Sequence, residues 1–153
     1  AAKKEGLESV KYAVPSTNEI AQTVQVMSRQ VDFIYVPLDN TIANAMQTVV
    51  KEANKANIPV IPSVDTMVEQ GGLATIGINQ YQLGLQSGKM AAELASGKEK
   101  PETTPVYTFD QGDTVINQSQ ADRLGIIVPQ SMKEKAKIIT DDSQQETSKE
   151  DDK

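Results

Sequence analysis

The sequence predicts an α/β fold with a parallel sheet and helices on both faces of that sheet. Two short apolar runs, residues 32–36 and 58–61, have the β-branched and aromatic composition of buried parallel strands. Strand, helix and strand in this order make a βαβ unit, and the crossover of such a unit is right-handed. Between the runs, apolar residues at helical spacing define the buried face of the helix: Ile42, Ala45, Met46, Val49, Val50 and Ala53.

The first fourteen residues predict the end of a helix followed by a strand. Residues 1–5 look like a last helical turn, Gly6 suits the C′ position that closes it, and residues 10–14 form the strand. Because the chain opens inside a helix and without methionine, we expect it to be the later part of a longer protein.

A helix over residues 20–31 is predicted next, with an apolar face that includes Ile20 and Val24. Ser16 and Glu19 have the spacing of a capping box at its start. A ligand-facing loop at residues 16–18 is the alternative. We favour the cap, because the spacing alone explains these residues.

The rest of the chain predicts short strands and helices separated by polar loops. Gly84 and Gly88 lie four apart on one of these helices, which favours close packing against a sheet or a neighbouring lobe. From Thr140 the chain is acidic and has no apolar residue, so we expect it to be disordered. The expected elements are a loop (66–72) with a Gly71-Gly72 turn, a strand (73–78), a helix (79–97), a linker (98–105), a strand (106–109), a turn (110–113), a strand (114–117), a helix (119–124) closed by Gly125, and a last helix (131–137).

These elements group into four parts along the chain. Residues 1–79 hold the βα units, and residues 80–105 hold a long helix with its linker. Residues 106–139 hold the final strands and short helices, and residues 140–153 form the acidic tail.

Composition excludes several classes of function. The net charge is −6 and no basic cluster is present, so a nucleic acid is not an expected partner. The chain has no cysteine and no histidine, which removes disulfides, thiolate chemistry and the commonest general base and zinc ligand. No phosphate-binding or nucleophile motif occurs, and Asp110 with Asp113 is better explained as a turn than as a cation loop. We therefore expect no cofactor and no metal.

Polar side chains gather immediately after the two strands of the βαβ unit. Asp39 and Asn40 follow the first strand, and Ser63 and Asp65 follow the second. In open parallel sheets, ligands bind outside the carboxyl ends of the strands. Asp39 or Asn40 is alternatively only a helix cap, and both interpretations stay open.

Asp65 is the favoured binding carboxylate, because no clear helix follows that it would need to cap; a solvated loop aspartate is the alternative. Two carboxylates are also compatible with a hydrolase. The neighbouring amides and hydroxyls, however, favour the binding of a polar ligand over its cleavage.

Four stretches together resemble the later part of ABC-transporter solute-binding proteins with the type I periplasmic-binding-protein fold. The branch is the one that includes tryptophan-binding lipoproteins of Gram-positive bacteria. The stretches are VKYAVPSTNEI, DFIYVPLDNTIANAM, NIPVIPSVDTMVEQGGLATIGINQYQLGLQSGKMAAELASGK and TVINQSQADRLGI.

This resemblance implies a two-lobed protein that closes over a ligand held between its lobes. The chain would form most of the second lobe, with residues 74–77 and 106–117 crossing to a first lobe that it lacks. The helix over residues 80–96 would pack on that first lobe. Asn79, on the crossing strand, would add an amide to the ligand site.

The function expected from the resemblance is the non-enzymatic substrate-binding component of an ABC importer. It would deliver an aromatic amino acid such as tryptophan to a permease. Asp39 or Asp65 would pair with the ammonium group, while Asn40, Ser63 and Asn79 orient the rest of the ligand.

The expected location is the outer face of the cell membrane, through a lipid anchor on the missing N-terminal part, or the periplasm. The apolar face of Leu83, Met90 and Leu94 could also pair copies of the chain. The alternatives are the effector-binding core of a transcription repressor with the same fold and, less favoured, a carboxylate-based enzyme.

Overall fold

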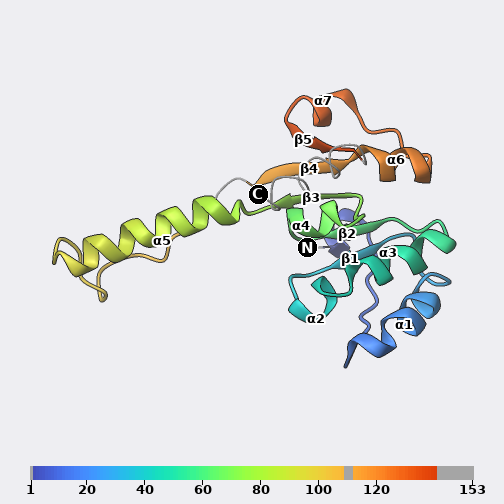
Figure 1. The fold of residues 1–153 in the computed structure, drawn as a ribbon, viewed down its shortest axis with the longest axis horizontal. Helices are drawn as coiled ribbons and strands as arrows, with labels where there is room; N and C mark the ends of the chain where they lie inside the picture. The colour runs from blue at the N-terminus through green and yellow to red at the C-terminus, as the bar shows by residue number, and fades with distance from the viewer. Residues whose placement is uncertain (1, 109–111, 141–153) are drawn as a thin grey trace, which may run out of the picture.

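The computed structural model describes residues 2–108 and 112–140, which fold into two small sheets with helices around them (Figure 1). The first sheet is parallel and the second is mixed, with β3 antiparallel to β4 and β4 parallel to β5. An α/β fold with a parallel sheet is therefore confirmed. The strands are β1 (Ile34–Val36) and β2 (Val60–Pro62) in the first sheet, and β3 (Ala74–Gly77), β4 (Asp113–Asn117) and β5 (Ala136–Ile139) in the second.

The main core lies between the first sheet and helices α1 (Ile20–Met27) and α3 (Met46–Lys55). Each fully buried aliphatic side chain contributes about 1.5–3 kcal/mol, so packing stabilises this layer more than its three-residue strands do. Tyr35 points to the opposite face of β1 and is 61% exposed. The buried core residues are Ile20, Val24, Ile34, Val36, Met46, Val49, Val50, Ala53, Val60, Val64 and Met67.

The crossover of the βαβ unit contains two helices where a single one was expected. Helix α2 (Asn40–Ala43) is separated from α3 by Ala45, whose φ of −121° lies outside the helical range. At the other end of α3, Asn57 has a φ of 57° and the Ile58 amide donates to the Ala53 carbonyl at 3.0 Å. This helix closure uses Ile58, which explains why β2 begins two residues later than expected.

The loop expected over residues 66–72 is wrong, because helix α4 (Asp65–Glu69) begins there. Its Met67 packs in the main core, whereas Val68 packs with Val115 and Ile139 beneath the second sheet. Helix α4 therefore joins the two sheets. Five residues are too few to show a helical period in the sequence.

The helix expected over residues 131–137 is also wrong. Helix α7 (Gln130–Lys133) is only one turn long, and β5 follows it and pairs with β4. The strands expected over residues 10–14 and 106–109 are not found at residues 10–14 or 106–108, because no described strand pairs with either segment. Phe109 and the expected disordered tail from residue 141 lie outside the described residues.

Several local predictions at helix ends are confirmed. The Ser16 amide and hydroxyl both donate to Glu19 Oε2 at 2.9 Å, so this pair caps the 3₁₀ turn η2 (Thr17–Glu19) that leads into α1. Helix α6 (Gln118–Leu124) ends at Gly125, whose φ is 68°. The first residues form a 3₁₀ turn, η1 (Ala2–Glu5), closed by Gly6.

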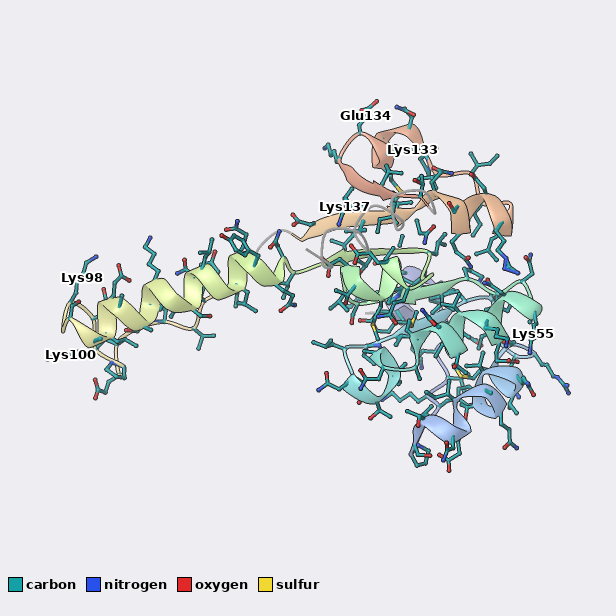
Figure 2. All side chains as sticks on the ribbon, viewed as in Figure 1. Lys55, Lys98, Lys100, Lys133, Glu134 and Lys137 are labelled. Carbon is teal, nitrogen blue, oxygen red and sulfur yellow. The ribbon has the colours of Figure 1, made fainter. Side chains whose placement is uncertain are left out.

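Helix α5 (Gln80–Ala95) projects away from the rest of the molecule, with Lys98 and Lys100 at its far end (Figures 1 and 2). None of its residues is buried. A methyl group on Gly84 or Gly88 would meet no described atom within 4 Å, so the described residues do not provide the close packing expected there. Tyr81 and Leu85 are 72% and 52% exposed, whereas the face that includes Leu83, Met90 and Leu94 is half-buried.

Candidate functional site

The three connections that follow β1, β2 and β3 start close together at one edge of the fold. Val36 and Pro62 are the last paired residues of β1 and β2, so the loops to α2 and α4 start side by side. The end of β3 lies close to them, because a Cβ on Gly77 would be 3.2 Å from the Ser63 carbonyl oxygen. The structure therefore brings together the strand ends that carry all five predicted site residues.

Asp39 and Asn40 stand at the start of α2. Asp39 is its N-cap, and Oδ1 accepts a hydrogen bond from the Ile42 amide at 3.0 Å. Asp39 Oδ2 has no hydrogen-bond partner among the described residues and the side chain is exposed. Asn40 is the exposed first residue of the helix. The cap observed at Asp39 leaves its second oxygen for another group.

Asp65 differs from its prediction, because a helix does follow it. It is the first residue of α4, and its Oδ1 accepts from the Thr66 amide at 2.9 Å. The side chain is half-buried. The free amides and positive dipole end of a helix N-terminus stabilise a carboxylate there, which is a structural reason for Asp65 in addition to ligand binding.

Ser63 carries a buried polar atom without a partner. Its Oγ is inaccessible to solvent and makes no hydrogen bond with any residue that the structure describes. Leaving a buried donor unsatisfied costs about 1–3 kcal/mol. Of the five predicted residues, this is the one whose hydrogen-bonding capacity is buried and unused, and it lies where β2 and β3 end next to each other.

Asn79 uses both ends of its amide within the fold. Its Oδ1 caps α5 by accepting from the Gln82 amide at 3.0 Å, and its Nδ2 donates to Asp113 Oδ2 at 2.8 Å. Asp113 begins β4 and was assigned to a turn from the sequence. No sequence signal links these two residues, because they are 34 positions apart.

Sequence reasoning also missed the apolar side chains beside the polar ones. Leu38 directly precedes Asp39 and is 64% exposed, and Ile78 directly precedes Asn79 and is 45% exposed. Large apolar side chains next to polar groups are typical of sites that bind a ligand with both an apolar and a charged part. The sequence offered a signal for Leu38, an aliphatic residue between Pro37 and the polar pair Asp39 and Asn40, whereas Ile78 was assigned to the preceding strand.

Two kinds of feature are absent from the described residues, 2–108 and 112–140. No group of three or more acidic side chains there is arranged to hold a metal ion. None of the helices in this part of the chain has the length and apolar character needed to cross a bilayer.

An α/β lobe with polar and apolar side chains at adjoining strand ends is typical of proteins that bind a ligand at this edge. The chain belongs to the family of ABC transporter substrate-binding proteins, which it matches over residues 1–139. A curated relative is the "Tyrosine-binding protein" of Clostridioides difficile (strain R20291). It is 36% identical over 117 residues, which cover 76% of this chain and 34% of the relative.

Solved structures resemble the chain closely and confirm its fold. The ABC domain of Streptococcus pneumoniae in complex with L-Trp superposes with a TM-score of 0.82 and 47% identity, over 90% of this chain and 47% of that one. A conserved domain protein of Vibrio cholerae has a TM-score of 0.80 and 30% identity, over 91% and 46%.

A third structure is the ligand-free, open form of a substrate-binding protein with adhesive properties from Clostridium difficile. Its TM-score is 0.72 and its identity 34%, over 91% of this chain and 46% of that one. The chain thus spans about half the length of these structures and about a third of the curated relative.

Proposed function

We propose that the chain supplies one lobe of a solute-binding protein that captures an aromatic amino acid for an ABC importer. Membership of the substrate-binding family supports the carrier role. The relatives named for L-Trp and tyrosine support an aromatic amino acid as the ligand. The observation that carries the site assignment is the buried, unpartnered Ser63 hydroxyl where the ends of β2 and β3 meet.

Each of the five residues has a proposed role in binding. Asp39, through its unused Oδ2, or Asp65 pairs with the α-ammonium group, and a charge-assisted contact of this kind contributes about 1.5–3 kcal/mol. Rotation of the Ser63 side chain, which is half-buried as a whole, would bring its hydroxyl to the ligand carboxylate or ammonium group, and Asn40 and Asn79 orient the rest.

The apolar part of the ligand needs its own contacts in this proposal. Leu38 and Ile78 lie next to the polar groups and are exposed, so they are available to the aromatic ring. Burying their apolar surface against the ring would add affinity, because each Å² removed from water contributes about 25 cal/mol.

A second lobe completes the site in this proposal. The apolar side of α5 formed by Tyr81, Leu85 and the open Gly84 and Gly88 packs against it. Closure follows because the ligand touches both lobes only when they are together. The loaded protein then delivers the ligand to the permease on the outer face of the membrane or in the periplasm.

Isothermal titration calorimetry of the protein with both lobes tests the ligand class. A panel of tryptophan, tyrosine, phenylalanine, leucine and glutamate should show tightest binding for an aromatic member. Failure of every amino acid to bind, or chemical turnover of any of them, would overturn the carrier proposal and favour the effector-core or enzyme alternatives.

Ser63→Ala tests the site itself. The substitution removes one hydroxyl, and we expect the affinity to fall about tenfold. Ser96→Ala, beyond the end of α5, is the matched control and should leave the affinity unchanged. Equal affinity in the wild type and Ser63→Ala would remove Ser63 from the site.

A further inference from the structure

A basic hollow lies between α3, the end of α4 and α6, on the side of the amino ends of β2 and β3 and therefore away from the ligand site at their carboxyl ends. Its volume is about 440 Å³. No carboxylate lines it, although the whole chain has a net charge of −6. Figure 2 shows Lys55 on the side of the molecule away from α5. The polar lining residues are the cations Lys51, Lys55 and Arg123 and the amides Gln47, Asn54 and Gln70.

Helical spacing places three of these side chains in one row. Gln47, Lys51 and Lys55 are four residues apart on α3 and share a face. Two like charges at this spacing destabilise a helix slightly unless an opposite charge lies between them. The helix dipole favours Lys55 and Arg123 in the last turns of α3 and α6, but it does not account for Lys51 in the middle of its helix.

The charges in the hollow are only partly compensated within the protein. Lys55 Nζ bonds Glu52 Oε1 at 2.6 Å. The charge of Lys51 also acts on the Glu52 carboxylate, but neither Lys51 nor Arg123 has a side-chain hydrogen bond or a close ion pair with the described residues. Both are exposed. The hollow therefore has two cations available to an anion from outside.

The side-chain amide of Asn54 is oriented by a hydrogen bond from a buried residue. Gln120 is only 7% exposed, and its Nε2 donates to Asn54 Oδ1 at 2.6 Å. This bond uses the acceptor of Asn54 and leaves its Nδ2 as a donor on the hollow. A buried glutamine that orients a surface asparagine gives the hollow a fixed element that a mobile lysine cluster lacks.

We propose that this hollow is a binding site for a tetrahedral oxyanion of the phosphate type. Lys51 and Arg123 neutralise its charge, and Arg123 presents paired donors that match phosphate oxygens. The amide nitrogen of Asn54 donates to a further oxygen. The site is independent of the amino-acid site, because the two lie at opposite ends of β2 and β3.

The test is a titration of the isotope-labelled protein with inorganic phosphate, followed by ¹H–¹⁵N NMR at constant ionic strength. We expect saturable shifts in the amides of residues 47–55 and 118–124. The double substitution Lys51→Gln/Arg123→Gln should weaken this binding about tenfold or more. The control Lys89→Gln/Lys100→Gln makes the same charge change on and beyond α5 and should bind phosphate as the wild type does.

The proposal is overturned if phosphate causes no saturable shift, or if the double variant binds as well as the control. Circular dichroism checks that both variants are folded, which we expect because all four side chains are exposed. Cosedimentation with phosphatidylcholine vesicles, with and without phosphatidylglycerol, then identifies the source of the phosphate group. If the protein binds the anionic vesicles and Lys51→Gln/Arg123→Gln abolishes this binding, the phosphate group belongs to a lipid headgroup. If the protein binds phosphate but not the vesicles, the ligand is a free anion.

Discussion

Asn79 and Asp113 are joined by a 2.8 Å hydrogen bond that ties the start of α5 to the start of β4. The same Asn79 side chain caps α5 through the Gln82 amide. Next to this bond, Gly112 approaches β3 so closely that a Cβ there would lie 2.8 Å from the Gly77 carbonyl oxygen. The start of α5 and the start of the central strand of the second sheet are thus linked at one point.

Replacement of Asn79 should loosen the first turn of α5. Asn79→Ala removes both the cap and the bond to Asp113, and loss of an N-cap alone costs about 0.5–2 kcal/mol. Hydrogen exchange should therefore become faster at residues 80–83. Asn79→Asp keeps the cap acceptor but cannot donate to Asp113, so its exchange should lie between those of the wild type and Asn79→Ala. Unchanged exchange in Asn79→Ala would contradict the capping role.

A methyl group at Gly112 should destabilise the protein, whereas one at Gly84 should not. In Gly112→Ala the new carbon would meet the Gly77 carbonyl at 2.8 Å and Ile76 Cγ2 at 2.9 Å, and such overpacking typically costs about 1–3 kcal/mol. In the 153-residue chain by itself, Gly84→Ala meets nothing within 4 Å and should stabilise α5 by about 0.5–1 kcal/mol. Urea unfolding measures both, and a Gly112→Ala protein as stable as the wild type would show that the β3–β4 contact is looser than described.

Loss of Met67 should be among the most damaging single changes. The residue is completely buried between the first sheet and α4. Met67→Ala leaves a cavity in the main core, and such changes cost about 2–5 kcal/mol. Met132→Ala, at a side chain that is 43% exposed, is the control and should change the free energy of unfolding by about 0.5 kcal/mol or less. Similar stabilities for the two variants would show that α4 does not hold the sheets together.

Acidification should remove the contribution of Glu52 to the stability of the folded protein. Hydrogen bonds from Gln25 and then Lys55 hold the pKa of Glu52 below its ordinary value of 4.5. A lowered pKa means that the folded state favours the carboxylate, so this stability is present above pH 4.5 and is lost as the pH falls through the folded-state value.

Glu52→Gln lacks this contribution at every pH. The difference in unfolding midpoint between the wild type and Glu52→Gln should therefore be largest near neutrality and shrink in acid. Glu102→Gln, at an exposed side chain, should track the wild type throughout. If this difference grew on acidification, folding would raise rather than lower the pKa of Glu52.

The position of the candidate site could be predicted from the sequence, but the hydrogen bonds of its residues could not. The apolar runs ahead of Asp39 and Ser63 were enough to place polar residues at two strand ends, because buried parallel strands are continuous apolar segments. Whether these residues bind a ligand stays a prediction. Three features depend on segments brought together from distant parts of the chain. Asp65 begins a helix, Asn79 bonds Asp113, and Ser63 Oγ is buried without a partner among the described residues.

By itself the sequence determined the features that depend on neighbours within a few residues. These are the helix cap at Ser16, the helix ends at Gly97 and Gly125, and the βαβ unit between β1 and β2, all of which follow from local hydrogen bonds, positive φ angles or apolar period. Only the tertiary structure decided that residues 136–139 form a strand. A strand is stable only when another strand satisfies its backbone groups, and β4, which does so here, lies about twenty residues away in the sequence.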